Sequence, residues 1–469
     1  MWTQRDQIQA YQFLRRRLVS ALVVADANHP VSPGRRLVIG SALGVAATVL
    51  VVGGFGIAGV IHPSANPDWR RGGQVIVEKE TGARFVLGQD QKLHPILNYA
   101  SARLLAGGNG GAKTITVAAG KLAGAPRGAM LGLVGAPDSL PQSGRLLAGP
   151  WTACTEQPAA RPSASAPVAT LIVGPHAAGT PLGATAGVVV RTASGTRFLL
   201  SAGQRFRIAD ELAAVSLGYD AVPALTVSPA FVDAVPAGRD LRPITVAGAG
   251  DPGPALRGAA TRVGQVLQVG TVGAGSRYYL VRADGLVAIT QVEAGLVLGN
   301  PADAAAYGAG PARPLTASAA AVAGAPRSAQ PPATGYPDGM PRPIAPLEPG
   351  AALCAEGDGL HDAQLFTAPD LPLPAGAAVT GTGADQVAVP PGRGALVAST
   401  QSPGAPAGTT YLITDTGRRY PVPNSDAASA LGYGGSTPVA VAPPVLALLP
   451  TGVTLDPGAA QQVVSGGFR

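Results

Sequence analysis

The sequence contains few aromatic and few charged residues. Aromatic side chains make up 4% of the 469 residues and charged side chains 13%, against about 25% charged residues in an average soluble protein. So few charges argue against a chain kept disordered by charge repulsion and against a coiled coil. With 64 Gly and 45 Pro, the composition favours several small, turn-rich domains over one large core.

Excess positive charge is confined to the N-terminus. The net charge is +7, but residues 1–36 hold six Arg and two Asp, which leaves 28 basic and 25 acidic residues for the remainder. That remainder lacks the basic surface of a nucleic-acid-binding protein. We therefore expect no nucleic-acid partner.

One long hydrophobic run stands out. Residues 37–61 carry no charge, and 25 residues are enough to cross a hydrocarbon layer of about 30 Å. A cleaved signal peptide has a shorter apolar region, so the run predicts a retained transmembrane helix. The preceding Arg residues place residues 1–36 in the cytoplasm and the rest of the chain outside it, by the positive-inside rule. Gly40 and Gly44 have the GxxxG spacing of a helix-packing face, although a glycine-rich anchor would show the same pattern.

Residues 3–26 have the pattern of an amphipathic helix. Thr3 and Asp6 resemble a capping box, and three Arg lie beside a stripe of apolar residues at helical spacing, which consists of Ile8, Tyr11, Leu14, Leu18 and Leu22. Such a helix either lies on a membrane surface or binds a partner, and the sequence leaves both readings open.

The sequence has two cysteines, Cys154 and Cys354, and both lie in the predicted exported region. A disulfide is the expected state in an oxidising compartment, and two free thiols are the alternative. The five His are scattered and have no metal-ligand spacing. We expect no metal and no cofactor.

Two internal alignments indicate duplicated modules. An offset of 214 residues aligns 203–243 with 417–457 without a gap, including an LGY triplet in both segments, and an offset of 193 aligns 84–96 with 277–289. Together they predict four related units, each with strands joined by tight turns and a short helix such as 208–217. The predicted first strands are 75–77, 188–190, 266–269 and 396–398.

These observations predict an α+β chain with a single N-terminal transmembrane helix and an elongated, β-rich extracytoplasmic region of four hairpin-based repeat domains around a central domain. The two Pro-rich segments are read as linkers. The predicted boundaries are 1–36 for the cytoplasmic helix and its basic flank, 37–61 for the transmembrane helix, 62–107 for repeat 1, 108–154 for the first part of the central domain, 155–186 for a linker, 187–261 for repeat 2, 262–300 for repeat 3, 301–349 for a second linker, 350–393 for the second part of the central domain, and 394–469 for repeat 4.

The sequence offers little evidence of catalytic chemistry. The stretch 107–114, GGNGGAKT, nearly matches a phosphate-binding loop, but Ala112 replaces its second glycine. No nucleophile motif or paired acid and base accompanies it. An Arg directly precedes an aromatic residue in each unit, at Arg84, Arg205, Arg277 and Arg419. We expect these side chains on the outer faces of hairpins and not in a ligand-binding site. No catalytic residue is predicted.

Several segments resemble EccB, the single-span B-type core component of actinobacterial type VII secretion systems. They are TQRDQIQAYQFLRRRLVSALV, GGQVIVEKETGARFVLG, LHPILNYASARLL, PRGAMLGLVGAPDSLP and WTAC. The resemblance implies four repeat domains around a central domain closed by a disulfide, in the cell's inner membrane. It implies as partners further copies of the chain, an FtsK/SpoIIIE-like motor ATPase, a multi-span membrane component and an E-type component.

Three functions compete at this stage. The first is a structural subunit of a protein secretion complex that builds its extracytoplasmic part and links to the motor ATPase. The second is an envelope anchor that binds a cell-wall polymer. The third is an extracytoplasmic nucleotide hydrolase, because members of the family have been labelled ATPases, although the defective loop at 107–114 does not support that label.

Overall fold

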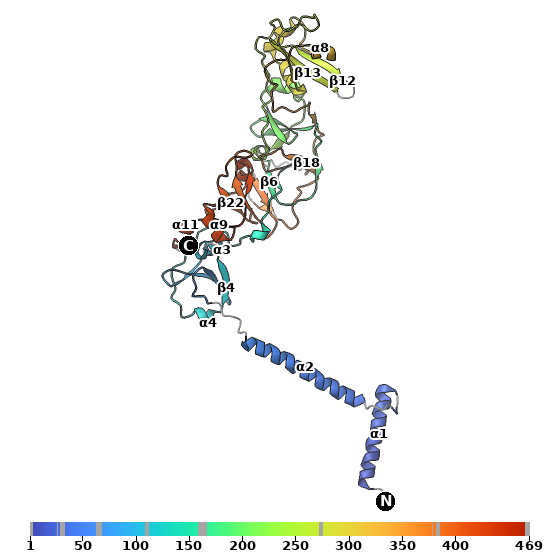
Figure 1. Ribbon diagram of the computed structural model, residues 1–469, viewed down its shortest axis with the longest axis vertical. Helices are drawn as coiled ribbons and strands as arrows, with labels where there is room; N and C mark the ends of the chain where they lie inside the picture. The colour runs from blue at the N-terminus through green and yellow to red at the C-terminus, as the bar shows by residue number, and fades with distance from the viewer. Residues whose placement is uncertain are drawn as a thin grey trace. The chain divides into compact units, whose positions relative to one another are not determined.

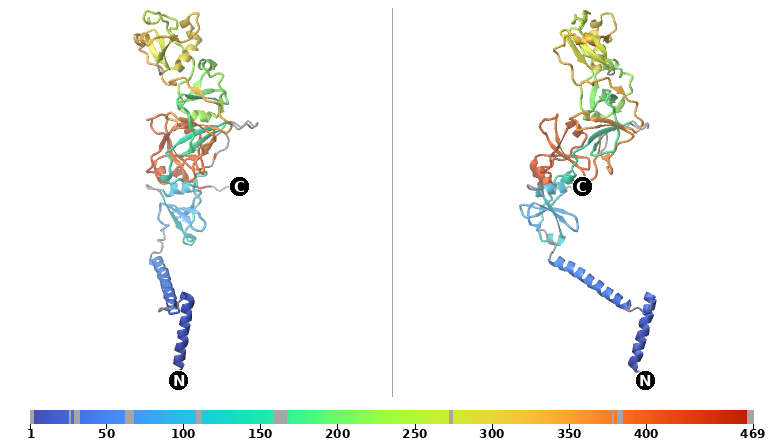
Figure 2. Two further views of the ribbon diagram at one scale, coloured as in Figure 1. Left: turned by 90° about the vertical axis from the view of Figure 1, so that its right-hand side faces the viewer. Right: turned by 45° about the vertical axis from the view of Figure 1, so that its right-hand side comes forward.

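The structure is a computed structural model of the 469-residue chain. It describes residues 3–25, 27–28, 33–61, 68–107, 112–157, 167–271, 275–377, 379–380 and 385–464. The chain divides into two compact units, Met1–Asp68 and Trp69–Arg469. Each unit is considered by itself (Figures 1 and 2).

The described residues of the first unit form two helices, α1 (Gln4–Val24) and α2 (Pro33–Ile61). Thr3 and Asp6 form the predicted capping box, in which the Thr3 backbone N–H donates to the Asp6 carboxylate at 3.0 Å. Helix α2 covers the whole uncharged run. Counting only the residues that the structure describes, no helix is both long and apolar enough to cross a membrane.

The second unit contains four sheets with one shared strand order. In each, three consecutive strands form an antiparallel meander, and a fourth strand pairs in parallel with the first. The strands are β1 (Gln74–Glu78), β2 (Arg84–Leu87), β3 (Leu93–Pro95) and β4 (Lys113–Val117); β8 (Ala186–Thr192), β9 (Arg197–Ser201), β10 (Gln204–Ile208) and β11 (Leu225–Val227); β12 (Val266–Thr271), β13 (Gly275–Arg282), β14 (Gly285–Ile289) and β15 (Leu315–Thr316); β21 (Ala395–Ser399), β22 (Thr410–Ile413), β23 (Arg419–Val422) and β24 (Val439–Val441).

Each of these sheets carries two short helices, one before and one after its fourth strand. The helices are α3 (Tyr99–Ala106) and α4 (Ala119–Leu122), α5 (Glu211–Leu217) and α6 (Pro229–Ala234), α7 (Gln291–Leu298) and α8 (Ala319–Ala323), and α9 (Ser425–Leu431) and α10 (Pro443–Ala447). We call the four βββαβα segments module A (74–122), module B (186–234), module C (266–323) and module D (395–447). A further helix, α11 (Pro457–Ala460), and two 3-10 helices, η1 (Ser143–Arg145) and η2 (Pro301–Tyr307), lie outside or between these elements.

Local sequence explains where the helices begin and end. The Asp210 side chain caps α5 by accepting a hydrogen bond from the Ala213 N–H at 2.8 Å. Helix α5 therefore begins at Glu211 and not at the predicted position 208, which is the last residue of β10. Gly218 ends α5 with φ 73°, a left-handed conformation that favours glycine, and Gly432 ends α9 in the same way with φ 100°. The first strand of each module begins within two residues of its predicted start.

A fifth sheet joins two distant parts of the chain. Its order is β19-β20-β6-β5-β17-β18-β7, and its strands are β5 (Trp151–Glu156), β6 (Ala169–Val173), β7 (Thr180–Pro181), β17 (Ala352–Glu356), β18 (Gln364–Ala368), β19 (Val379–Thr380) and β20 (Asp385–Ala388). We call it the central sheet. Strand β5 pairs with β17, so two segments about 200 residues apart in the sequence meet in one sheet.

The structure differs from the predicted boundaries in three places. The segments 155–186 and 301–349 were expected to be linkers, yet the first contains β6 and β7, and the second contains β15, α8 and β16 (Arg342–Pro343). Strand β4 was assigned to the central domain but pairs with β1 in module A. The very short strands, and strand β6, which is buried along its whole length, give no alternating pattern of apolar and polar residues. The composition of these segments alone therefore suggested linkers.

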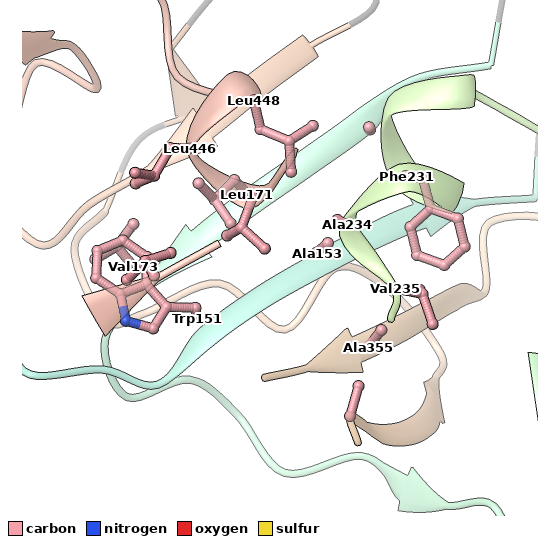
Figure 3. Close-up of a cluster of buried hydrophobic side chains, with 14 of the residues drawn as sticks. Trp151, Ala153, Leu171, Val173, Phe231, Ala234, Val235, Ala355, Leu446 and Leu448 are labelled. Atoms are coloured by element: carbon pink, nitrogen blue, oxygen red, sulfur yellow. The ribbon is translucent and has the colours of Figure 1, made fainter. Parts of the chain in front are cut away.

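The largest hydrophobic core lies against the central sheet. Helices α6 and α10, from modules B and D, pack side by side and insert Phe231 and Leu446 towards it (Figure 3). Trp151 of β5, Leu171 of β6 and Ala355 of β17 belong to the same cluster, and the side chains of this cluster are buried. Because the core draws on two modules and the central sheet, these three parts stabilise one another.

Candidate functional site

The predicted partner-binding stripe lies on α1 and is exposed. Ile8 is 56% exposed and Leu22 is 82% exposed, and Tyr11, Leu14 and Leu18 lie between these values. An apolar face with this exposure is uncommon in a soluble helix, because burial of such side chains is what stabilises most helices in proteins.

The predicted packing glycines lie on α2. A Cβ built on Gly40 or on Gly44 meets no atom within 4 Å, so both positions are open in the single chain. Side chains on α2 are described for residues 38–53, and the other glycines of the predicted span, from 54 onwards, lie outside that part.

The structure contains the predicted disulfide between Cys154 and Cys354. The two residues lie directly opposite each other on β5 and β17, and both are fully buried. The bond therefore joins the fourth and fifth strands of the seven-stranded sheet and links residues 200 positions apart.

The LGY triplets, found by sequence comparison, carry two equivalent tyrosines. The Tyr219 hydroxyl donates to the Pro341 carbonyl oxygen at 2.7 Å, and the Tyr433 hydroxyl donates to the Pro141 carbonyl oxygen at 2.7 Å. Each tyrosine is 2% exposed, and burial raises the pKa of both phenols. Module B thus holds the segment that follows module C, and module D holds the segment that follows module A.

The same two module pairs also meet through their helices. Helix α3 of module A packs on α9 of module D, and α7 of module C packs on α5 of module B. A Cβ on Gly107, which ends α3, would lie 2.6 Å from the Ala430 Cα, and a Cβ on Gly299, which ends α7, would collide with Ser216. Ser216 and Ala430 are themselves 214 residues apart, so the close approach occurs at equivalent positions.

A sequence relation that the internal alignments missed accompanies these contacts. The segments 126–141 and 326–341 share Pro-Arg at their start and a G-x-P-D-x-x-P ending at an offset of 200, which is also the offset between the two cysteines. A search for further offsets would have found it. Modules A and D therefore make contacts that modules C and B repeat.

Three of the four recurring arginines contact side chains from the same module or from the segment that follows it. Arg84 pairs with Asp138, Arg205 pairs with Asp233, and Arg419 lies 5.1 Å from the centre of the Tyr411 ring. Arg277 is exposed, as predicted for all four. Partial burial lowers the pKa of Arg419.

The near-match to a phosphate-binding loop does not form the structure that such a loop requires. Residues 108–111 lie outside the described residues, but Lys113 is the first residue of β4 and Thr114 the second. In a phosphate-binding loop the corresponding Lys and Ser or Thr begin a helix whose N-terminus binds the phosphates. In the part of the chain that the structure describes, no group of three His, Cys, Asp or Glu side chains could hold a metal ion.

Comparison with known proteins assigns the family. Residues 1–466 match the family described as "Type VII secretion system ESX-1, transport TM domain B". The chain belongs to the EccB family. The ESX-5 secretion system ATPase EccB5 of Mycobacterium tuberculosis is 29% identical over 96% of this chain and 92% of its own length. The ESX-3 secretion system ATPase EccB3 of Mycolicibacterium smegmatis is 29% identical over 97% and 89%.

Solved EccB-containing structures have the same fold. A chain of an intact ESX-5 inner membrane complex covers 99% of this chain and 96% of its own length, with a TM-score of 0.65 and 26% identity. An EccB3 dimer from the ESX-3 core complex covers 83% and 100%, with a TM-score of 0.67 and 26% identity. The mixed α+β architecture of several small sheets is thus that of the EccB family.

Proposed function

We propose that this chain is a structural subunit of a type VII secretion complex in the inner membrane. The proposal rests on the match to the EccB family along residues 1–466. It is supported by a chain of a solved ESX-5 inner membrane complex, which aligns with 99% of this chain. In this proposal α2 spans the membrane once, α1 lies in the cytoplasm and Trp69–Arg469 lies outside. The absence of charge over residues 37–61 and the six preceding Arg support this orientation.

The proposed partners follow from the surfaces that the two units offer. The exposed stripe of α1 would contact the motor ATPase or a membrane component, and Gly40 and Gly44 would pack against a neighbouring transmembrane helix. The second unit would contact further copies of the chain, a proposal supported by a solved EccB3 structure that is a dimer. We further propose that modules A to D are the four repeat domains and that the central sheet is the central domain between them.

Nucleotide hydrolysis is not part of this proposal. The relatives carry the word ATPase in their names, but in this chain the Lys and Thr of the nearest phosphate-loop pattern begin a strand. The subunit would therefore contribute binding surfaces and leave ATP hydrolysis to the motor partner.

Co-purification from membranes tests the role of the α1 stripe. Leu14 and Leu18 are four residues apart and share one helix face, so Leu14→Asp with Leu18→Asp places two charges within the stripe. Gln9→Asp is the matched control, because nine residues turn a helix by about 180° from Leu18. We expect the double variant to lose a co-purifying FtsK-like ATPase and the control to keep it, and equal recovery from both would refute the assignment of α1.

A further inference from the structure

Charge is unevenly distributed within the second unit. Residues 69–128, which contain module A, hold nine basic and three acidic side chains, whereas residues 129–469 hold 19 basic and 21 acidic ones. All four lysines of the chain lie in the first of these segments, at Lys79, Lys92, Lys113 and Lys121. Module A is therefore the basic part of a unit that is otherwise close to neutral.

Five of these basic residues lie along one edge of the sheet in module A. The sheet order is β3-β2-β1-β4, so β4 is an edge strand, and α4 follows it (Figure 1). We call these five residues the basic edge, and all of them are exposed: Arg70, Arg71, Lys79, Lys113 and Lys121.

The basic edge extends over both ends of β4. Lys113 begins β4 and pairs with the first residue of β1, which Arg70 and Arg71 precede in the chain. At the other end, the Lys79 N–H donates to the carbonyl oxygen of the last residue of β4 at 3.0 Å, and Lys121 lies in α4. The five positive charges thus cover the length of the strand, about 15 Å.

Two carboxylates lie near the basic edge, and both are bound within their own module. The Glu80 carboxylate accepts a hydrogen bond from the Ala119 N–H at 2.8 Å, and the Glu78 carboxylate accepts one from the Thr81 hydroxyl. Among the described residues, the lysines of the basic edge form no ion pair. Module A therefore leaves a net positive charge along this edge.

Lysines on an edge strand also discourage its pairing with other chains. That role explains Lys113, which lies in β4 itself. It does not explain Lys79, which follows β1, or Lys121, which lies in α4. A negatively charged surface that contacts the whole edge accounts for all three.

A short connection limits the distance between the end of α2 and module A. Six residues, 62–67, separate Ile61 from Asp68, and a fully extended chain covers about 25 Å over that interval. With α2 across the membrane, module A therefore stays close to the lipid headgroups. Each basic residue near an anionic bilayer strengthens binding by about fivefold.

We propose that the basic edge binds the headgroups of anionic phospholipids at the outer surface of the membrane. The ammonium and guanidinium groups pair with phosphate oxygens, and the attraction acts over about one Debye length, so it weakens as the salt concentration rises. This inference rests on the proposed function, because the membrane span of α2 is what brings module A to the bilayer.

Lysine acylation of the full chain in nanodiscs tests the contact. The discs contain phosphatidylcholine alone or with about 30% phosphatidylglycerol, which supplies the anionic headgroups. A water-soluble acylating reagent modifies exposed amines, and mass spectrometry gives the rate at each lysine. Lys92 is the internal reference, because it directly precedes β3 at the opposite edge of the sheet, three strand spacings or about 14 Å away.

We expect Lys79, Lys113 and Lys121 to react about threefold or more slowly, relative to Lys92, in the anionic discs than in the neutral discs, because the headgroups cover these amines. The difference should disappear in 1 M NaCl, where the Debye length is about 3 Å. Equal relative rates in both lipids would overturn the proposal. Slower reaction of Lys92 alone would overturn it as well, because a different face of module A would then contact the bilayer.

Matched variants separate the basic edge from net charge. Lys113→Gln with Lys121→Gln should weaken the contact about 25-fold and remove the protection of Lys79. Arg313→Gln with Arg342→Gln removes the same charge from exposed positions outside module A and should keep that protection. Loss of protection in both double variants would refute a specific role for the basic edge.

Incorporation into the discs is measured separately by size-exclusion chromatography. A chain that fails to enter either type of disc would refute the membrane span, and with it this inference. A chain that enters both types and shows no lipid-dependent protection would refute the basic edge alone and leave the proposed function intact.

Discussion

The two buried tyrosines give a direct test of the repeated module contacts. Tyr433→Phe removes the donor to the Pro141 carbonyl oxygen, and Tyr219→Phe removes the donor to the Pro341 carbonyl oxygen. Each ring is 2% exposed, so water does not readily replace the lost hydroxyl. A buried carbonyl group that loses its donor costs about 1–2 kcal/mol, which corresponds to about a 5- to 30-fold increase in local opening.

The two variants act as controls for each other. Hydrogen exchange should increase in residues 133–141 of Tyr433→Phe and in residues 333–341 of Tyr219→Phe, and each variant should leave the other segment unchanged. Substitutions at separated sites usually add, so the double variant should show both effects in full. Increased exchange spread evenly over both segments in either single variant would refute the view that each tyrosine holds its own module pair.

Three further predictions concern stability. Replacement of Cys154 and Cys354 by Ala should lower the free energy of unfolding by up to about 5 kcal/mol, because the bond closes a loop of about 200 residues; an unchanged denaturation midpoint would contradict this. Gly107→Ala should cost about 1–3 kcal/mol by pushing α3 away from α9, whereas Gly120→Ala in α4 meets no atom within 4 Å and should not destabilise the fold in the same thermal melt. Burial raises the pKa of Glu293, so the ionised carboxylate destabilises the folded chain at pH values above that pKa. Glu293→Gln should therefore increase the free energy of unfolding by about 1 kcal/mol at pH 7.5 and give no increase at pH 4, where the carboxyl group is protonated. The same increase at both pH values would contradict this assignment.

The sequence predicted local features better than contacts between distant segments. The capping residues Thr3 and Asp6, the glycine that ends α5 and the turns between strands act within a few residues, so spacing alone identifies them. The offset of 214 residues identified equivalent helices and even equivalent ends, since α5 and α9 differ by that number at both termini. Compartment chemistry was enough to predict the disulfide.

The remaining features depend on tertiary structure. Tyr433 and Pro141 are 292 residues apart, and the hydrogen-bonded pair of His176 and Glu356 is separated by 180 residues, so no local pattern connects the members of either pair. The fourth strand of each module has two to five residues and pairs in parallel with the first strand of its own module. Such a strand is stable only where the sheet already exists. For this reason β15 was read as part of a linker, and β4 was assigned to the central domain.

The position of the disulfide determines how the second unit would carry mechanical tension. Near its C-terminal end, the chain is pinned to the segment after module A, where the Val464 N–H donates to the Met130 carbonyl oxygen at 2.9 Å. Tension applied between Trp69 and the C-terminal end can pass from Cys154 directly to Cys354, so the 199 residues between them, with modules B and C, lie off the covalent load path. Modules B and C can open or rearrange under tension without lengthening the covalent path that bears it. Reduction of the Cys154–Cys354 disulfide would make the 199 intervening residues part of that path.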